Sequence, residues 1–97
     1  MKIMLVCAGG MSTSILMKKM EKFGVEKGVD LDIKAFAVQD LEENYKSYDV
    51  ILLGPQISYK FNDIKKSVTT PVGVIQSYDY AVGNVENIMR LVQSILK

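Results

Sequence analysis

Histidine is absent from this sequence of 97 residues, and there is one cysteine, Cys7. Without histidine and with a single thiol, the chain lacks the His/Cys sets that hold zinc, so we expect no metal. It cannot close an internal disulfide, and imidazole general-base chemistry is excluded within the chain. A free thiol without a disulfide framework is typical of a reducing compartment, and we therefore expect a cytoplasmic protein.

The sequence also has little net charge and no long hydrophobic run. Twelve Lys and Arg oppose 11 Asp and Glu, for a net charge of +1. The basic residues are scattered, which argues against nucleic acid as a partner. The apolar run at residues 3–6 is too short for a signal-peptide core, and no stretch approaches membrane-spanning length, so we expect no membrane insertion. The length predicts one domain over residues 1–97.

Four short apolar segments predict strands. Two of them are continuous apolar runs closed by Gly9-Gly10 and by Gly54-Pro55, a pattern typical of strands buried on both faces. Another alternates apolar and polar residues, which favours an edge strand. The predicted strands are residues 3–6, 31–37, 50–53 and 72–75.

Helical periodicity separates these strands. Leu16, Met20 and Phe23 recur at i, i+4 and i+7 and predict a helix over residues 11–27. Gly24 in its last turn costs up to about 1 kcal/mol relative to alanine, which would allow the helix to end earlier. The other predicted helices are residues 39–45, residues 57–68 and a last helix from residue 85 on, capped by Asn84.

Strands that alternate with helices predict an α/β fold, a parallel sheet between two layers of helices in a three-layer sandwich. In such sheets, ligands bind outside the carboxyl ends of the strands. The candidate site is therefore the loop after the first strand, beside the loop after the third.

The first of these loops reads Cys-Ala-Gly-Gly-Met-Ser-Thr-Ser over residues 7–14. The glycines let the backbone turn sharply and approach a ligand, and the hydroxyl residues open a helix whose N–H groups favour an anion. The same helix terminus favours the thiolate form of a cysteine, which makes Cys7 a candidate nucleophile. The candidate phosphate-binding residues are Ala8, Gly9, Gly10, Met11, Ser12, Thr13 and Ser14.

A lone cysteine at the end of a buried strand is usually a small core residue without chemistry. The residues around Cys7 decide between the two interpretations. Packing a core needs neither a Gly-Gly pair nor three consecutive hydroxyl residues, whereas a phosphate cradle needs all of them. The loop therefore favours function.

Other phosphate and redox motifs fail on spacing. The residue five after Gly9 is Ser14, so the loop is not a nucleotide-triphosphate P-loop, and no Gly-x-Gly-x-x-Gly follows the first strand. Gly10 stands three after Cys7, which excludes a Cys-x-x-Cys pair. We accordingly expect no cofactor.

Two cysteine-phosphate families remain. Low-molecular-weight tyrosine phosphatases carry Cys-x-x-x-x-x-Arg-Ser in this loop, and the arginine clamps the phosphoryl group. This chain has Thr13 at that position. It resembles instead the enzyme IIB component of the phosphoenolpyruvate-dependent sugar phosphotransferase system, of the lactose/cellobiose (chitobiose) family. The resemblance lies in the loop Cys-x-x-Gly-Met-Ser-Thr-Ser and in Leu-Leu-Gly-Pro-Gln-Ile over residues 52–57, and it extends from Lys2 to the last helix.

The resemblance implies a four-stranded parallel sheet of order 2-1-3-4, similar to that of the low-molecular-weight tyrosine phosphatases. It implies that a phosphohistidine of the IIA component passes its phosphoryl group to Cys7. The phosphocysteine then passes the group to a sugar held by the membrane IIC component. Gln56 follows the third strand and could donate from its amide as a second contact, with a plain strand-to-helix turn as the alternative.

The resemblance leaves the sugar open among cellobiose, chitobiose, lactose and other β-glucosides. Two other functions stay open on the residues alone. One is a low-molecular-weight cysteine phosphatase-like hydrolase, against which Thr13 counts, since Arg90 in the last helix is the chain's one arginine. The other is a phosphate-binding domain without catalysis.

Overall fold

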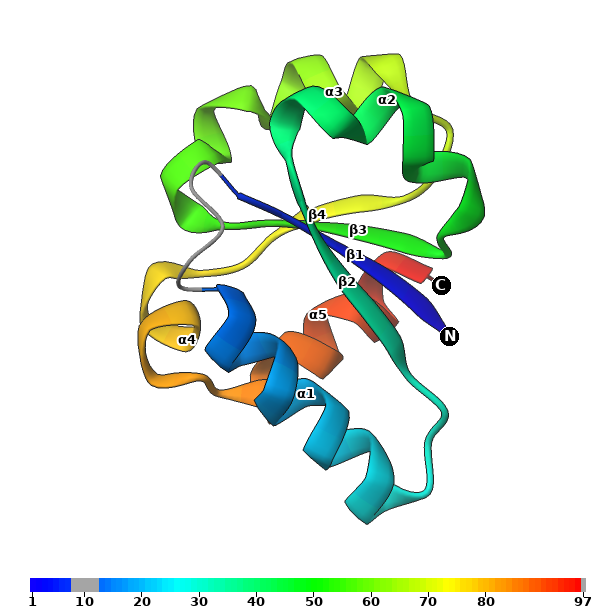
Figure 1. Cartoon of the computed structure of the whole chain (residues 1–97). Helices are drawn as coiled ribbons and strands as arrows, with labels where there is room; N and C mark the ends of the chain where they lie inside the picture. The colour runs from blue at the N-terminus through cyan, green and yellow to red at the C-terminus, as the bar shows by residue number, and fades with distance from the viewer. Residues whose placement is uncertain (8–12, 97) are drawn as a thin grey trace.

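The computed structural model describes residues 1–7 and 13–96, in which a central sheet lies between two layers of helices (Figure 1). All neighbouring strands are parallel, and their order is β2-β1-β3-β4. The predicted fold class and strand order are therefore confirmed, with β2 at an edge and β3 in the interior. The strands are β1 (Lys2–Cys7), β2 (Asp32–Ala37), β3 (Val50–Leu53) and β4 (Val72–Val74).

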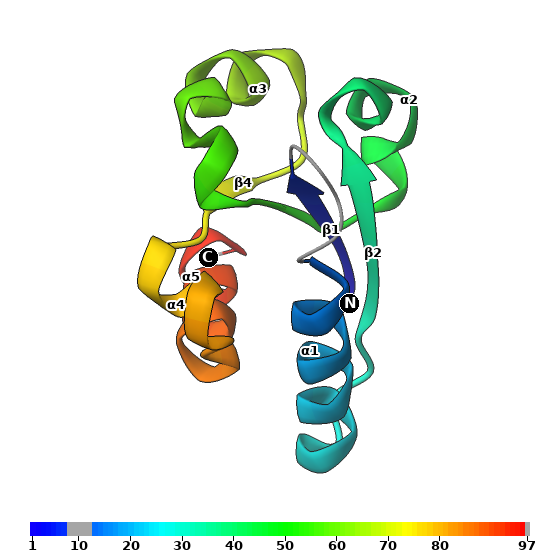
Figure 2. The same ribbon diagram turned by 60° about the vertical axis from the view of Figure 1, so that its left-hand side comes forward.

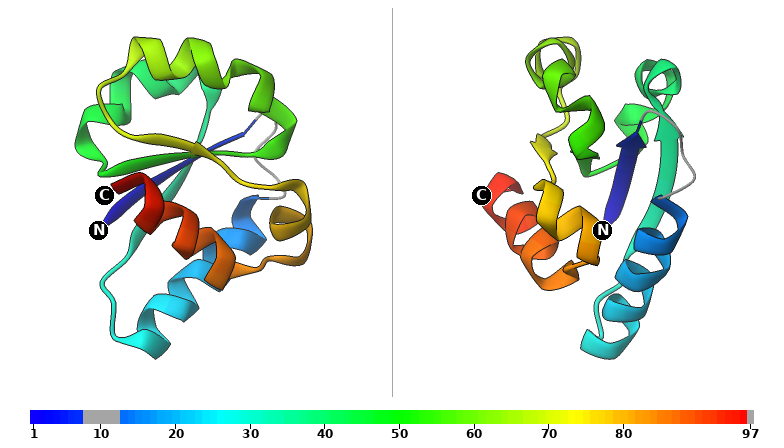
Figure 3. Two further views of the ribbon diagram at one scale, coloured as in Figure 1. Left: turned by 180° about the vertical axis from the view of Figure 1, so that it is seen from behind. Right: turned by 90° about the vertical axis from the view of Figure 1, so that its left-hand side faces the viewer.

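The helices divide between the two faces of the sheet (Figures 2 and 3). Helices α1 (Thr13–Lys27), α4 (Ser77–Val82) and α5 (Val85–Leu96) cover one face. Helices α2 (Leu41–Asn44) and α3 (Phe61–Ser67) cover the other. Short 3₁₀ helices extend α2 on both sides and precede α3, at Val38–Asp40, Tyr45–Ser47 and Pro55–Lys60.

Each face of the sheet has its own apolar core, which explains the continuous apolar runs in β1 and β3. Successive side chains of a strand point to opposite faces. In β1, Ile3 and Leu5 pack with α1 and α5, whereas Met4 and Val6 pack with α2 and α3. All four residues of β3 are buried in the same alternating way. The carboxyl ends of both central strands are thus held rigidly from two sides.

The predicted helix over residues 57–68 is not continuous. Its first turns are the 3₁₀ helix Pro55–Lys60, which Ile57 interrupts with φ −117° and ψ 21°. Helix α3 ends at Ser67, and Val68 is extended. Ile57, Ile64 and Val68 are nevertheless buried in one cluster. The apolar spacing therefore predicted the buried face correctly, although only part of the backbone is α-helical.

Helix α1 does not end early at Gly24. It continues to Lys27, and Gly28 follows with φ +68°. The amide of Gly28 donates to the Val25 carbonyl (3.3 Å) and the amide of Val29 to the Gly24 carbonyl (2.8 Å), which form a Schellman turn. The predicted start of this helix at residue 11 lies outside the described residues.

Helix α4 was not predicted from the sequence, because six residues carry too little periodicity. It ends at Gly83, where φ is +67°. The predicted cap of α5 is confirmed: the Asn84 Oδ1 accepts from the amide of Asn87 at 3.3 Å.

Candidate functional site

Cys7 is the last residue of β1, at the carboxyl end of a central strand (Figure 1). It pairs with Ala37 of β2, and 3% of its surface is exposed. The apolar residues before it fix the strand in both cores, so the thiol is placed where parallel α/β sheets bind their ligands. This is the location that the sequence predicted for the nucleophile.

The predicted phosphate loop lies mostly outside the described residues. That is the case for Ala8, Gly9, Gly10, Met11 and Ser12. The backbone of Thr13 and Ser14 forms the start of α1, a helix of 15 residues. Of the predicted anion-binding features, the structure therefore describes the helix that follows the loop.

The turn after β3 lies directly beside Cys7. The amide of Gly54 donates to the Val6 carbonyl at 2.9 Å, which ties this turn to the end of β1. A Cβ on Gly54 would lie 3.6 Å from the Cys7 Cβ and 3.0 Å from the Gln56 Oε1. Gly54 has an ordinary φ of −64°, so the need for glycine is one of space. The structure thus brings Cys7, Gly54 and the exposed Gln56 together.

The end of the sheet that carries Cys7 also carries α4, which follows β4. Tyr78 is 70% exposed, and Tyr80 is half-buried. On the neighbouring α1, Lys18 and Lys19 are both exposed. Lys19 in addition donates from its Nζ to the Val82 carbonyl at 3.3 Å, which joins α1 to the end of α4.

Asp79 of α4 is the polar residue that sequence reasoning missed. It is 8% exposed and accepts a hydrogen bond at Oδ1 from the Asn87 Nδ2 at 3.2 Å. A single aspartate in a short helix gives no periodic signal. Its partner, eight residues away, can be identified only once the turn between α4 and α5 is known.

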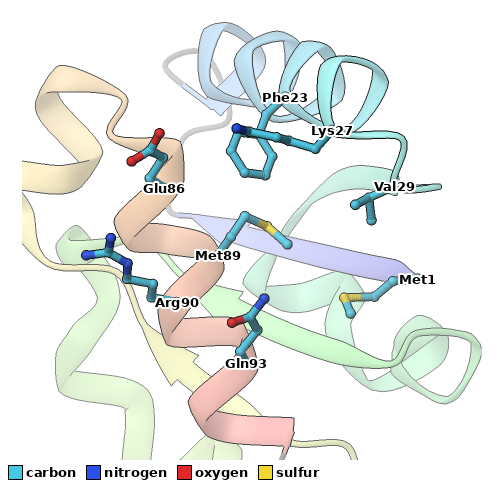
Figure 4. Close-up of a pocket in the computed structure, with 8 residues that line it drawn as sticks. All are labelled: Met1, Phe23, Lys27, Val29, Glu86, Met89, Arg90 and Gln93. Carbon is cyan, nitrogen blue, oxygen red and sulfur yellow. The ribbon is translucent and has the colours of Figure 1, made fainter.

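A pocket of about 420 Å³ lies between α1 and α5 (Figure 4). Phe23 and Lys27 line it from α1, and Met89 lines it from α5, with Met1 closing one end. None of the predicted site residues lines this pocket. Its size alone therefore gives no reason to move the candidate site away from Cys7.

Over the described ranges, no three His, Cys, Asp or Glu side chains come together as metal ligands. Among the same residues, no helix is both long enough and apolar enough to cross a membrane.

Comparison with known proteins gives a consistent picture. A family model described as "PTS system, Lactose/Cellobiose specific IIB subunit" matches residues 2–91. The chain is 31% identical to the PTS system galactose-specific EIIB component of Lactococcus lactis subsp. cremoris (strain MG1363), over 97% of this chain and 94% of that protein. It is 30% identical to the PTS system cellobiose-specific EIIB component of Lactococcus lactis subsp. lactis (strain IL1403), with the same coverage of both chains.

A solved structure agrees with these relatives. The cellobiose-specific phosphotransferase IIB component protein from Borrelia burgdorferi superposes on this chain with a TM-score of 0.82 at 34% sequence identity. The superposition covers 99% of this chain and 91% of that one.

Proposed function

Because the chain belongs to the lactose/cellobiose-specific IIB family, whose members are phosphotransferase subunits of the sugar phosphotransferase system, we propose that Cys7 is its phosphoryl carrier. The donor is a phosphohistidine of the IIA component. The acceptor is a β-linked disaccharide of the cellobiose, chitobiose or lactose type, held by the membrane IIC component. The chain acts as a single domain in the cytoplasm. The observation that carries the proposal is the position of its one thiol, at the carboxyl end of β1 beside the Gly54 turn.

In the first transfer, the Cys7 thiolate attacks the phosphorus of the IIA phosphohistidine. The S–P bond forms as the P–N bond breaks, and the imidazole nitrogen leaves with the electron pair. The chain contains no histidine, so the donor imidazole has to come from the partner. The N–H groups of residues 8–14, together with the hydroxyl groups of Ser12, Thr13 or Ser14, stabilise the equatorial phosphoryl oxygens at the start of α1.

In the second transfer, a hydroxyl oxygen of the sugar attacks the same phosphorus atom. The O–P bond forms, the S–P bond breaks, and the thiolate of Cys7 is restored, while the hydroxyl proton passes to a base in the IIC–sugar complex. Between the two steps the phosphocysteine must not react with water. Hydrolysis is attack of water on the phosphorus in line with the S–P bond, so a carrier must lack a group that positions or activates such a water molecule.

Intact-protein mass spectrometry tests the carrier role. The chain is incubated with phosphoenolpyruvate, the general relay proteins and a lactose/cellobiose-type IIA. We expect one added phosphoryl group, labile as a thiophosphate, and none on Cys7→Ser. An unmodified chain beside a IIA that is shown to be phosphorylated would contradict the proposal, as would an adduct that Cys7→Ser retains.

Thr13 argues against the hydrolase alternative. A phosphatase needs a clamp on the phosphoryl group while water attacks, whereas a carrier must keep its phosphocysteine until the sugar arrives. An arginine at this position would accelerate hydrolysis, whereas the threonine at position 13 supplies no such clamp. We expect Thr13→Arg to shorten the lifetime of the phosphorylated chain or to raise aryl phosphate hydrolysis. If it does neither, this explanation of Thr13 is wrong.

Docking of the partners is supported by exposed apolar side chains on α1 and α4. Ile15 in the first turn of α1 is 65% exposed, and Tyr78 and Val82, one turn apart on α4, are 70% and 47% exposed. The hydrogen bond from Lys19 to the Val82 carbonyl places these two helices side by side. IIA and IIC would use this surface in turn, so each contact has to be transient.

A further inference from the structure

A second pocket, of about 330 Å³, lies at the edge of the sheet formed by β4, against α4 and α5. Its lining does not include Cys7, Gly54 or Gln56. The volume is within the range of small-molecule sites. Its polar lining consists of the main chain of Val74 and the side chains of Gln76, Asp79, Asn87, Arg90 and Ser94.

The Asp79 side chain is the buried acceptor of this pocket. More than nine-tenths of Asp79 is buried. Its Oδ1 accepts from the Asn87 Nδ2 at 3.2 Å, whereas its Oδ2 has no hydrogen-bond or ion-pair partner within the described part of the chain. No buried side-chain nitrogen or oxygen of the described residues lacks a partner, so this Oδ2 is open to water in the pocket, where a ligand hydroxyl can replace a water molecule as its donor.

Arg90 supplies the opposite charge. Its Nη1 donates to the Asn87 Oδ1 at 3.5 Å, and its other N–H groups have no hydrogen-bond partner among the described residues. Asn87 thus bridges Asp79 and Arg90 and holds both side chains beside the pocket. The guanidinium has five donors and no acceptor. Arg90 is exposed and lines both this pocket and the one between α1 and α5.

The edge of β4 adds a main-chain donor and acceptor. The amide of Ile51 donates to the Pro71 carbonyl (2.9 Å), and the amide of Ile75 donates to the Leu53 carbonyl (3.0 Å). Alternate residues of a strand direct their main-chain groups to opposite sides. Val74 therefore directs its N–H and C=O away from β3, at the edge of the sheet where this pocket lies.

We propose that this pocket binds a neutral, polyhydroxylated small molecule, that is, a sugar or a similar polyol. A hydroxyl group both donates and accepts, so one ligand can donate to the Asp79 Oδ2 and the Val74 carbonyl and accept from Arg90 and the Val74 amide. The two charges select against ions, since a cation meets Arg90 and an anion meets Asp79. Ile88 and Leu91 offer an apolar surface to the C–H groups of the ligand.

Two-dimensional NMR on the whole chain tests this site, with glucose and cellobiose as probes at concentrations up to tens of millimolar. We expect saturable shifts, with a millimolar dissociation constant, for the Asn87 side-chain amide and for the backbone amides of Asp79 and Ser94. Binding should be the same for Cys7→Ser, because the pocket does not include the carrier thiol. Unchanged spectra would overturn the proposal, and so would shifts with glycine alone, which would mark a site for a zwitterion.

Asp79→Asn is the matched variant. Its carbonyl oxygen can still accept from Asn87, but an amide N–H₂ replaces the free Oδ2, so a donor faces the hydroxyl donor of the ligand. We expect sugar binding to weaken by about tenfold or more. Glu86→Gln is the control, because Glu86 lies on α5 but lines the other pocket, and it should bind as before. If Asp79→Asn bound sugar with the same affinity as the unaltered chain, the proposal would be contradicted. If that variant does not fold, the mapping of shifts on the unaltered chain tests the proposal instead.

Discussion

At the scale of single residues, the site depends on the space that Gly54 leaves open. The glycine has a φ that any residue can adopt, so its backbone does not require it. What requires it is the close approach of the Gln56 side chain, whose Oε1 lies 3.0 Å from where a Cβ would stand. Gly54 therefore allows the Gln56 amide to lie over the turn beside Cys7.

Gly54→Ala should separate stability from activity. The added Cβ meets the flexible end of Gln56, so we expect the free energy of unfolding to stay the same or to rise by up to about 1 kcal/mol. The rate of phosphoryl transfer from IIA should fall several-fold, because the Gln56 amide is displaced. Denaturant unfolding and single-turnover transfer measure the two quantities.

Gln56→Ala is the control for this interpretation. It should lower the transfer rate by about as much as Gly54→Ala, and the double variant should be no slower than either, because the two changes remove one interaction. Additive losses, or a Gly54→Ala chain that transfers at the normal rate, would show that Gly54 does not act through Gln56, and a normal rate for Gln56→Ala would exclude Gln56 from the site.

The residues near Cys7 could be predicted from the sequence because two glycine-containing turns follow two strands that are apolar throughout. Parallel strands bring such turns to one end of the sheet. Asp79 could not be predicted in this way, because its burial results from the pairing of two short polar side chains across the turn between α4 and α5. No local pattern marks such a pair.

At the scale of secondary structure elements, the end of α1 shows why Gly24 is tolerated inside a helix. A Cβ at this position would lie 2.8 Å from the Val29 carbonyl oxygen and 3.1 Å from the Leu31 Cδ1. The Val29 amide donates to the Gly24 carbonyl, so this backbone is part of the turn that ends the helix. The chain folds back so closely that only glycine fits.

Gly24→Ala should therefore destabilise the protein, although alanine is favoured in helix interiors by about 1 kcal/mol. We expect a loss of about 1–3 kcal/mol in the free energy of unfolding, as for other overpacked sites. The neighbouring Val25→Ala is the control: Val25 is 82% exposed, and the change should stay within about 0.5 kcal/mol. Chemical denaturation measures both, and a stabilised Gly24→Ala would refute the close contact.

Helix α4 should matter for partner docking. Tyr78 is 70% exposed on this helix, so its truncation removes contact area without opening the core. We expect Tyr78→Ala to lower the second-order rate constant for transfer from IIA by about tenfold, as for a residue central to an interface. Val25→Ala, exposed at the last turns of α1, should transfer at the normal rate. Equal rates for the two variants would place the docking surface elsewhere.

The sequence pattern predicted all four strands and the long helices, but it missed one short helix and the irregular start of another. Helix α5 has 12 residues and a clear apolar face, and its Asn84 cap could be predicted as well. Helix α4 has six residues, and the 3₁₀ helix Pro55–Lys60 has an irregular Ile57. In both segments the conformation follows from contacts with the rest of the fold and not from local preference.

At the scale of the whole molecule, the two ends of the sheet serve different purposes. Cys7 and Gly54 lie at the carboxyl end. At the amino end, polar and main-chain groups tie the strands together: the Lys2 amide donates to the Asp49 Oδ2, and the Asp49 amide donates to the Lys2 carbonyl, both at 2.8 Å. Tyr48 lies beside this link, with its ring edge-on to Phe36 at 5.6 Å.

The stability of the protein should fall at high pH partly through Tyr48. Burial raises the pKa of its phenol above the ordinary value of 10.0; Asp32 adds to the rise, and Lys2 opposes it. Below pH 10 the phenol is protonated in both states, so the effect of Tyr48 on stability is constant there. Above that value the unfolded chain loses the proton first, which favours unfolding.

Thermal unfolding of Tyr48→Phe against the unaltered chain across the alkaline range isolates this effect, since phenylalanine keeps the ring contact and removes the hydroxyl group. The loss of stability above pH 10 should be smaller in the variant. If stability fell equally with pH in the two chains, this role of Tyr48 would be contradicted.

The central claim is that Cys7 carries a phosphoryl group from protein to sugar, and the most direct test follows that group. The chain is phosphorylated with labelled phosphate, separated from its donor and mixed with membranes that contain the matching IIC and a β-linked disaccharide. We predict that the label leaves the protein only when IIC and sugar are both present, and that it appears as sugar phosphate. Label released as inorganic phosphate without them would identify a hydrolase, and label that stays on the protein in their presence would contradict the carrier role.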